Sequence, residues 1–255
     1  MRHSGAVRLN VLMSAFDSFL LQVVEAVTDS ADTLGVLLHG SYASGSCDSN
    51  SDVDLICITR SRQPRRISHH FINGREIGVF ASSRPQISKS FHFDSGDNNN
   101  FVLYGFVRGR PVIDRNGDLA DLIREANQIW QQGPPNPTPE FREKIAAGHQ
   151  IIIGSLSRWT ARATRSPQWR EMVQLFSARL FNDCFYQYCR IHRLWSSAIW
   201  EMLTWTDPRY EEILKITRNY LSDPSLENRL QAIRQLAEAT IIACDGNLEP
   251  ISTSG

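Results

Sequence analysis

Two short polar motifs, each beside an apolar stretch, carry the residues best suited to chemistry. Gly40-Ser41 follows the apolar residues 35–39, and Asp52-Val53-Asp54 opens a second apolar stretch that continues to Thr59. A Gly-Ser pair at the end of a strand presents backbone N–H groups and a hydroxyl, which suit phosphate oxygens. Aspartates two residues apart in a strand point to the same face of a sheet. The motifs therefore indicate a site for a metal-bound polyphosphate.

Such a site suits the transfer of a nucleotidyl group. Asp52 and Asp54 would bind one or two Mg²⁺ ions through hard oxygen ligands, and such a pair of ions, roughly 3.5–4 Å apart, stabilises the attacking and leaving oxygens. Gly40 and Ser41 would hold the β- and γ-phosphates, which leave as pyrophosphate. A third carboxylate from a neighbouring strand would take the proton of the acceptor hydroxyl. Glu76 is the candidate at a suitable distance in the sequence.

The surrounding sequence predicts the elements that position these residues. Apolar residues recur with helical spacing over residues 11–27. Turn signals occur at residues 72–75 and at Asn116-Gly117, and Asp118 is expected to cap the helix that follows. The remaining predicted elements are strands at 35–39, 52–59, 76–81 and 112–114, a short helix at 44–48 facing the Gly-Ser turn, and a helix at 119–131.

A proline-rich segment marks the clearest boundary in the chain. Residues 133–139 contain four prolines within six positions, which neither a helix nor a central strand accommodates. The domains expected are therefore a catalytic domain at 1–132, a linker at 133–139, a helical domain at 140–246 and a disordered tail at 247–255. Helical periodicity predicts helices near 140–164, 168–193, 195–204, 208–221 and 225–244, with Asp207-Pro208 and Asp223-Pro224 as helix starts.

Composition narrows the cellular setting and the partners. Lys+Arg and Asp+Glu are both 27, so the net charge is zero, and no basic tract favours a nucleic-acid partner. No apolar run approaches the ~18 residues that a membrane span needs. The five cysteines are odd in number and lack zinc-ligand spacing, which fits a reduced cytoplasmic protein. The oligomeric state is left open.

The pattern Gly40-Ser41, ten residues, Asp52-x-Asp54 resembles the nucleotidyltransferase superfamily with the DNA polymerase β-like fold. It is similar to the aminoglycoside nucleotidyltransferases and to the minimal nucleotidyltransferases of toxin–antitoxin pairs. The resemblance covers about residues 10–130. It implies an α+β fold: a mixed sheet flanked by helices, followed here by an all-α bundle that looks like the substrate-binding domain of antibiotic-modifying members.

The resemblance also implies roles for single residues. Gly40 and Ser41 match the nucleotide-binding pair, Asp52 and Asp54 match the metal-binding pair, and Glu76 matches the third catalytic acid. Related sequences often carry an aspartate two residues after such a glutamate, where this chain has Gly78. If the third acid belongs at 78, the protein lacks it.

The function expected is therefore Mg²⁺-dependent transfer of a nucleoside monophosphate, from ATP or another triphosphate, to an acceptor hydroxyl. An aminoglycoside-like small molecule is the expected acceptor. The alternatives are a protein- or RNA-modifying transferase and a catalytically impaired nucleotide-binding protein. The other candidate residues are expected to have structural roles. His69, His70 and His92 are interpreted as surface residues, and His39 as either a nucleotide contact or a packed residue at the end of a strand. Most aromatic residues after 170 are expected in the core of the helical bundle.

Overall fold

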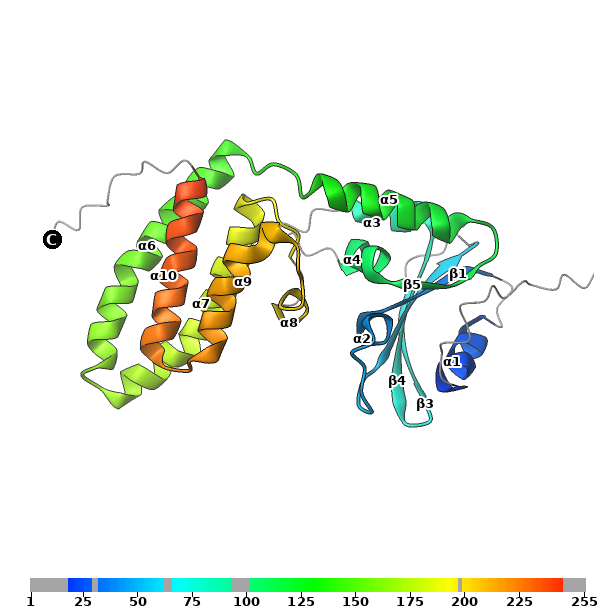
Figure 1. Cartoon of the computed structure of the whole chain (residues 1–255), viewed down its shortest axis with the longest axis horizontal. Helices are drawn as coiled ribbons and strands as arrows, with labels where there is room; N and C mark the ends of the chain where they lie inside the picture. The colour runs from blue at the N-terminus through cyan, green and yellow to red at the C-terminus, as the bar shows by residue number, and fades with distance from the viewer. Residues whose placement is uncertain (1–17, 29–31, 62–65, 93–100, 197–198, 245–255) are drawn as a thin grey trace, which may run out of the picture. The chain divides into compact units, whose positions relative to one another are not determined.

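The structure is a computed structural model that describes residues 18–28, 32–61, 66–92, 101–196 and 199–244. Within these residues the chain divides into two compact units, the first ending at Gln132 and the second beginning at Gly133. The first unit combines a sheet with helices, whereas the second contains helices only (Figure 1).

The first unit is built on a five-stranded mixed sheet with the strand order β3-β4-β2-β1-β5. Strands β2 and β4 run parallel, and the other neighbouring pairs are antiparallel. This arrangement confirms the α+β class and the mixed sheet that the resemblance implied. The strands are β1 (Thr33–His39), β2 (Val53–Thr59), β3 (Arg66–Ile72), β4 (Arg75–Ser83) and β5 (Arg110–Asp114).

Helices cover both faces of this sheet (Figure 1). On one face, α1 (Ser18–Thr28) packs its apolar side against residues such as Val36 and Cys57. Strand residues alternate between faces, so Ile56 and Ile58 point to the other face. There they meet α4 (Phe101–Arg108) and α5 (Asp118–Gln132). A further helix, α3 (Arg84–Phe91), follows β4 and contacts both α4 and α5. We call these two faces the α1 face and the α4 face.

Several predicted elements of this unit are confirmed and others need correction. Residues 11–17 of the first predicted helix lie outside the described residues, and the rest forms α1. The short helix predicted at 44–48 is wrong, because α2 occupies Gly40–Ser44 and ends at Gly45 in a left-handed conformation. Asp114 rather than Asp118 caps α5, since its carboxylate accepts from backbone N–H groups at the start of that helix. Strand β3 and the helices α3 and α4 were not predicted.

The second unit is a bundle in which α6, α7 and α10 pack together and α9 packs against α10. Its helices are α6 (Pro139–Ala163), α7 (Pro167–Ile191), α8 (Ile199–Met202), a 3₁₀ turn (Pro208–Tyr210), α9 (Glu211–Ser222) and α10 (Leu226–Ala243). Thr138 caps α6 by accepting a hydrogen bond from the N–H of Phe141, 3.2 Å away. Four of the five predicted helices are confirmed approximately. Of the described residues in the predicted 195–204 helix, which exclude 197–198, only Ile199–Met202 are helical.

Two proline-linked helix starts behave differently. Asp207 accepts from the N–H of Arg209 and begins the 3₁₀ turn, as predicted. Asp223 does not begin α10 directly, because Ser225 is the residue that accepts from the N–H of Asn228. Asp223 instead accepts from the N–H of Ser225 and fixes the turn before the helix.

A buried histidine links three helices of the bundle. His149 of α6 is fully buried, with Nε2 2.5 Å from the side-chain oxygen of Gln187 in α7 and Nδ1 3.4 Å from the carbonyl of Ala237 in α10. Burial lowers the pKa of His149, and the two hydrogen bonds oppose this shift without cancelling it. The ring is therefore neutral in the folded protein near neutral pH, so only one of its two nitrogens carries a hydrogen to donate.

Among the described residues, no helix is both long and apolar enough to cross a membrane.

Candidate functional site

The Gly-Ser motif forms the first turn of α2, directly after β1. Gly40 adopts a φ of 70°, a left-handed conformation that favours glycine. Ser41 follows within the helix, and its hydroxyl oxygen is buried with no hydrogen-bond partner among the described residues. A buried hydroxyl without a partner is unfavourable, so a ligand oxygen is the natural group to complete it.

Asp52 and Asp54 stand at the start of β2. Asp52 is exposed and immediately precedes the strand, whereas Asp54 is half-buried within it. Asp54 pairs with His39 of β1 on one side and with Gly78 of β4 on the other. Because Asp54 and Ile56 are two residues apart, the carboxylate points to the α4 face. Asp52 lies before the first residue of β2, so the expectation that the two aspartates share a face stays a prediction.

Two glycine backbones hold the carboxylate of Asp54 between them. A Cβ atom at position 40 would lie 2.7 Å from Oδ2 of Asp54, and a Cβ atom at position 78 would lie 2.9 Å from its Oδ1. Both distances are too short for a real Cβ contact. Gly40 and Gly78 therefore bracket this carboxylate from opposite sides, and a side chain at either position would displace it.

Glu76 lies two residues before Gly78 in β4, so its side chain points to the same α4 face. Its Oε1 accepts a hydrogen bond from Nδ1 of His69 in β3, at 2.6 Å. Both side chains remain accessible, with 44% of Glu76 and 60% of His69 exposed. Sequence reasoning treated His69 as a surface residue of a turn-rich segment. The structure places it in a strand, in contact with the predicted third acid.

The candidate metal ligands are two carboxylates rather than three. Among the described residues, no group of three or more His, Cys, Asp or Glu side chains is arranged to hold a metal ion. Mg²⁺ commonly takes only one or two protein carboxylates and completes its octahedron with water and substrate phosphates. Asp52 and Asp54, beside the unpartnered hydroxyl of Ser41, form a donor set that fits this habit.

His39 lies beside Asp54 but is packed rather than free to act. Its ring lies under Gly105 of α4, whose missing side chain leaves room for it. Burial lowers the pKa of His39 to about 4, although the negative charge of Asp52 opposes that shift. His39 is therefore neutral near pH 7. Of its two predicted roles, packing at the end of the strand is the one that its contacts support.

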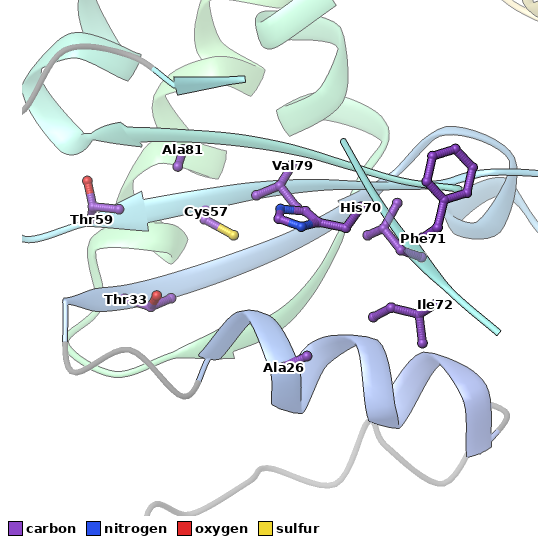
Figure 2. Close-up of a pocket in the computed structure, with 10 residues that line it drawn as sticks. Ala26, Thr33, Cys57, Thr59, His70, Phe71, Ile72, Val79 and Ala81 are labelled. Atoms are coloured by element: carbon purple, nitrogen blue, oxygen red, sulfur yellow. The ribbon is translucent and has the colours of Figure 1, made fainter. Parts of the chain in front are cut away.

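A separate cavity of about 450 Å³ lies on the α1 face of the sheet. Figure 2 shows Cys57, Val79 and Ala81 of the sheet lining it together with Ala26 of α1 and His70 of β3. Cys57 is an odd number of residues from Asp54 and points away from it. This cavity is therefore on the opposite face from the two aspartates and is not part of the candidate nucleotide site.

The aromatic residues of the second unit are mostly buried, as predicted. Phe181, Phe185, Tyr188, Trp195 and Trp205 all belong to the core, whereas Phe176 is 53% exposed. The hydroxyl of Tyr188 donates to Oε2 of Glu212 at 2.7 Å. Burial, followed by this bond and the charge of Glu212, raises the pKa of Tyr188 above its usual range.

This combination of mixed sheet, Gly-Ser helix start and paired aspartates defines a nucleotidyl-transferring class of domain. Residues 20–129 match the family model described as "Nucleotidyltransferase domain". The match is confined to these residues of the first unit, and for them it supports a general transfer of a nucleoside monophosphate.

Comparison with solved structures adds distant likenesses, including one to a nucleotidyltransferase-like protein from Exiguobacterium sibiricum. That protein is 14% identical, with a TM-score of 0.37; the match covers 88% of this chain and 75% of that one. None of the curated proteins compared with the chain matches it.

Proposed function

We propose that the first unit transfers a nucleoside monophosphate from Mg²⁺-bound ATP to an acceptor hydroxyl and releases pyrophosphate. The observation that carries the proposal is the fixed carboxylate of Asp54, held between Gly40 and Gly78 and next to the Gly-Ser turn. A site arranged this way holds a carboxylate in one orientation before the substrate arrives. Such preorganisation is what a phosphoryl-transfer centre requires, because most of its catalysis is positioning and charge stabilisation.

Each residue of the motif has a role in this proposal. Asp52 and Asp54 hold Mg²⁺, which neutralises charge on the triphosphate when it is bound. The backbone of Gly40 and the hydroxyl of Ser41 bind the phosphates that leave as pyrophosphate. Glu76 assists removal of the proton from the acceptor hydroxyl. The neutral ring of His39, the residue paired with Asp54, packs against Gly105 of α4 and has no chemical role in this proposal.

The acceptor in this proposal is a small hydroxylated molecule of the aminoglycoside-like kind, which the helical unit would help to bind. The separate bundle of six helical segments supports this choice, because a transferase acting on exposed protein or RNA ends has less need of one. A protein or RNA acceptor remains the alternative within the same chemistry.

A second candidate function is nucleotide binding without turnover. Gly78 and the lack of a three-residue ligand group among the described residues favour it. Turnover separates the two candidates.

The test measures binding and chemistry in the same full-length protein. Calorimetry with Mg²⁺ and α,β-methylene ATP reports nucleotide affinity, and pyrophosphate release from α-labelled ATP reports turnover. The acceptor probes are water, kanamycin, and protein, RNA and small-molecule fractions of a bacterial extract. We expect Asp54→Asn to abolish release and Asp52→Asn to lower it strongly. Binding without release for every acceptor would favour the second candidate.

A further inference from the structure

We infer that His69, oriented by Glu76, takes the proton from the acceptor hydroxyl in this reaction. The inference rests on the proposed function and changes the part that Glu76 plays in it. It begins from a row of paired residues across four strands of the sheet: His39 in β1, Asp54 in β2, Gly78 in β4 and His69 in β3. Directly paired residues of adjacent strands project to the same face. His69 and Asp54 therefore share the α4 face.

The residue between them in the row leaves the space open. Gly78 has no side chain, and within 4 Å of the position where its Cβ would lie the described residues place only Oδ1 of Asp54. A larger residue at 78 would fill the space between the side chains of Asp54 and His69; we call this space the open lane. Gly78 stands where the family pattern has an acid. Because it has no side chain, it also leaves space on the sheet surface between Asp54 and His69.

Glu76 fixes which nitrogen of His69 is available. Nδ1 donates its hydrogen to Oε1 of Glu76 at 2.6 Å, so the neutral ring keeps its lone pair on Nε2. A carboxylate in this position orients the ring and stabilises the imidazolium once a proton arrives, as in other carboxylate–histidine pairs. With 60% of its side chain exposed, His69 is open to an incoming substrate.

The neighbours of His69 on the same face suit an organic acceptor. Ile67 and Phe71 lie two residues to either side, and they are 62% and 74% exposed. Large apolar side chains exposed on both sides of a polar pair offer contact area for a ring or a carbon skeleton. The acceptor in this arrangement lies over β3 and approaches Asp54 across Gly78.

The step balances as a simple transfer. The acceptor oxygen forms a bond to the α-phosphorus of ATP, and the bond from that phosphorus to the oxygen bridging the β-phosphate breaks. Pyrophosphate leaves with the electron pair of that bond. The hydroxyl proton moves to Nε2 of His69, while the hydrogen on Nδ1 stays on the ring and hydrogen-bonded to Glu76. The resulting imidazolium returns the proton to solvent after the products leave.

His70 provides a matched control one residue away. Its ring lies among the residues lining the cavity on the α1 face (Figure 2), and its Nε2 bonds to the hydroxyl of Ser68 at 3.0 Å. His70→Gln therefore makes the same chemical change in the same strand but on the opposite face of the sheet. Both histidines are accessible, so neither substitution disturbs the core.

The experiment compares His69→Gln, Glu76→Gln, His70→Gln and Asp54→Asn in the full chain. Pyrophosphate release is measured with the acceptor probe on which the wild type is fastest, over a range of pH. Affinity for Mg²⁺ and α,β-methylene ATP is measured in parallel. We expect His69→Gln to lower kcat by about 100-fold or more, to remove the acid-side limb of the pH profile, and to leave nucleotide affinity within about twofold. We expect His70→Gln to match the wild type.

Glu76 is a positioning residue here, and its variant should show it. Glu76→Gln is expected to lower kcat by about tenfold and to leave nucleotide affinity within about twofold, because a neutral amide orients the His69 ring less firmly than the carboxylate does. Wild-type kcat in His69→Gln, with Asp54→Asn inactive, would overturn the role of His69 and leave the proposed function standing. No turnover by the wild type with any probe would overturn both.

Discussion

The position opposite Asp54 offers the sharpest test of how rigidly this site is built. Replacing Gly78 by alanine would place a Cβ atom 2.9 Å from Oδ1 of Asp54, inside the distance of an ordinary contact. The carboxylate cannot simply turn away, because Gly40 lies against its other oxygen. It must leave its preferred rotamer, at a cost of about 0.5–1.5 kcal/mol. We expect Gly78→Ala to lower the free energy of unfolding by about 1 kcal/mol.

The effect on binding should exceed what the stability change suggests. Metal coordination depends on where the carboxylate points, so a displaced Asp54 should weaken Mg²⁺–nucleotide affinity by about tenfold, or about 1.4 kcal/mol. Gly40→Ala applies the same pressure from the other side and adds the strain of a left-handed residue, about 1–2 kcal/mol. It should therefore destabilise the fold by about 2–3 kcal/mol.

Gly148 supplies the control for both substitutions. It lies in α6 of the second unit, and a Cβ atom there would meet nothing within 4 Å. Gly148→Ala should raise the free energy of unfolding by about 0.5–1 kcal/mol, because alanine is the better helix residue. Urea unfolding and calorimetry measure all three variants. Unchanged nucleotide affinity in Gly78→Ala, with stability equal to the wild type, would refute the claim that two glycines fix Asp54.

Gly78→Asp distinguishes the two interpretations of the glycine. If the chain merely lacks a third acid, an aspartate at 78 should increase pyrophosphate release. If the open lane to His69 matters, the same change should lower release, since it places a second carboxylate against Asp54 and fills the lane.

Three further predictions concern single polar side chains. Ser41→Ala should leave urea stability unchanged or raise it by about 1 kcal/mol, since the buried hydroxyl has no partner, yet weaken nucleotide binding about tenfold or more; equal affinity would contradict its phosphate role. Thr138→Ala should cost about 1 kcal/mol by removing the cap of α6, and a neutral result would show the cap to be dispensable. His149 has a lowered native pKa, so the unfolded chain binds more protons below about pH 6.5, and stability should fall as the pH drops through that value. His149→Leu should reduce this dependence in urea titrations at pH 5 and 7.5 and leave the part that His39 contributes through its own lowered pKa; an unchanged slope would refute the contribution of His149.

The parts of the fold that sequence could predict are those with a regular apolar pattern. Strands β1 and β2 read as apolar runs because both of their faces are covered. Strand β3 escaped prediction because it is an edge strand, and most of its side chains are exposed on both faces. The signal that could have revealed it is the Asn73-Gly74 turn, where both residues have positive φ. A two-residue turn of this kind requires a strand before it as well as after it.

The sequence could name the candidate residues of the site but could not predict their geometry. Period-two spacing predicts that Asp52 and Asp54 share a face, and the structure places Asp54 within β2 and Asp52 just before it. The start of α2 at Gly40 was not predictable, because a five-residue helix carries no periodicity and its first residue has a positive φ. The contact between His69 and Glu76 depends on the register of β3 against β4, which is a property of the paired strands and not of either alone.

Gly78 and His69 are best understood as one feature. In the register of this sheet, an acid at 78 would place its side chain directly between Asp54 and His69. The side chain of this acid would displace the carboxylate of Asp54 and separate it from His69. With glycine at that position, Asp54 keeps a single orientation against two backbones, and the edge-strand histidine faces it across an open lane. The loss of one expected carboxylate and the presence of a histidine held by Glu76 are therefore compatible with a working centre. With Gly78 in place of an acid in β4, the group that accepts the proton is His69 in the neighbouring edge strand β3.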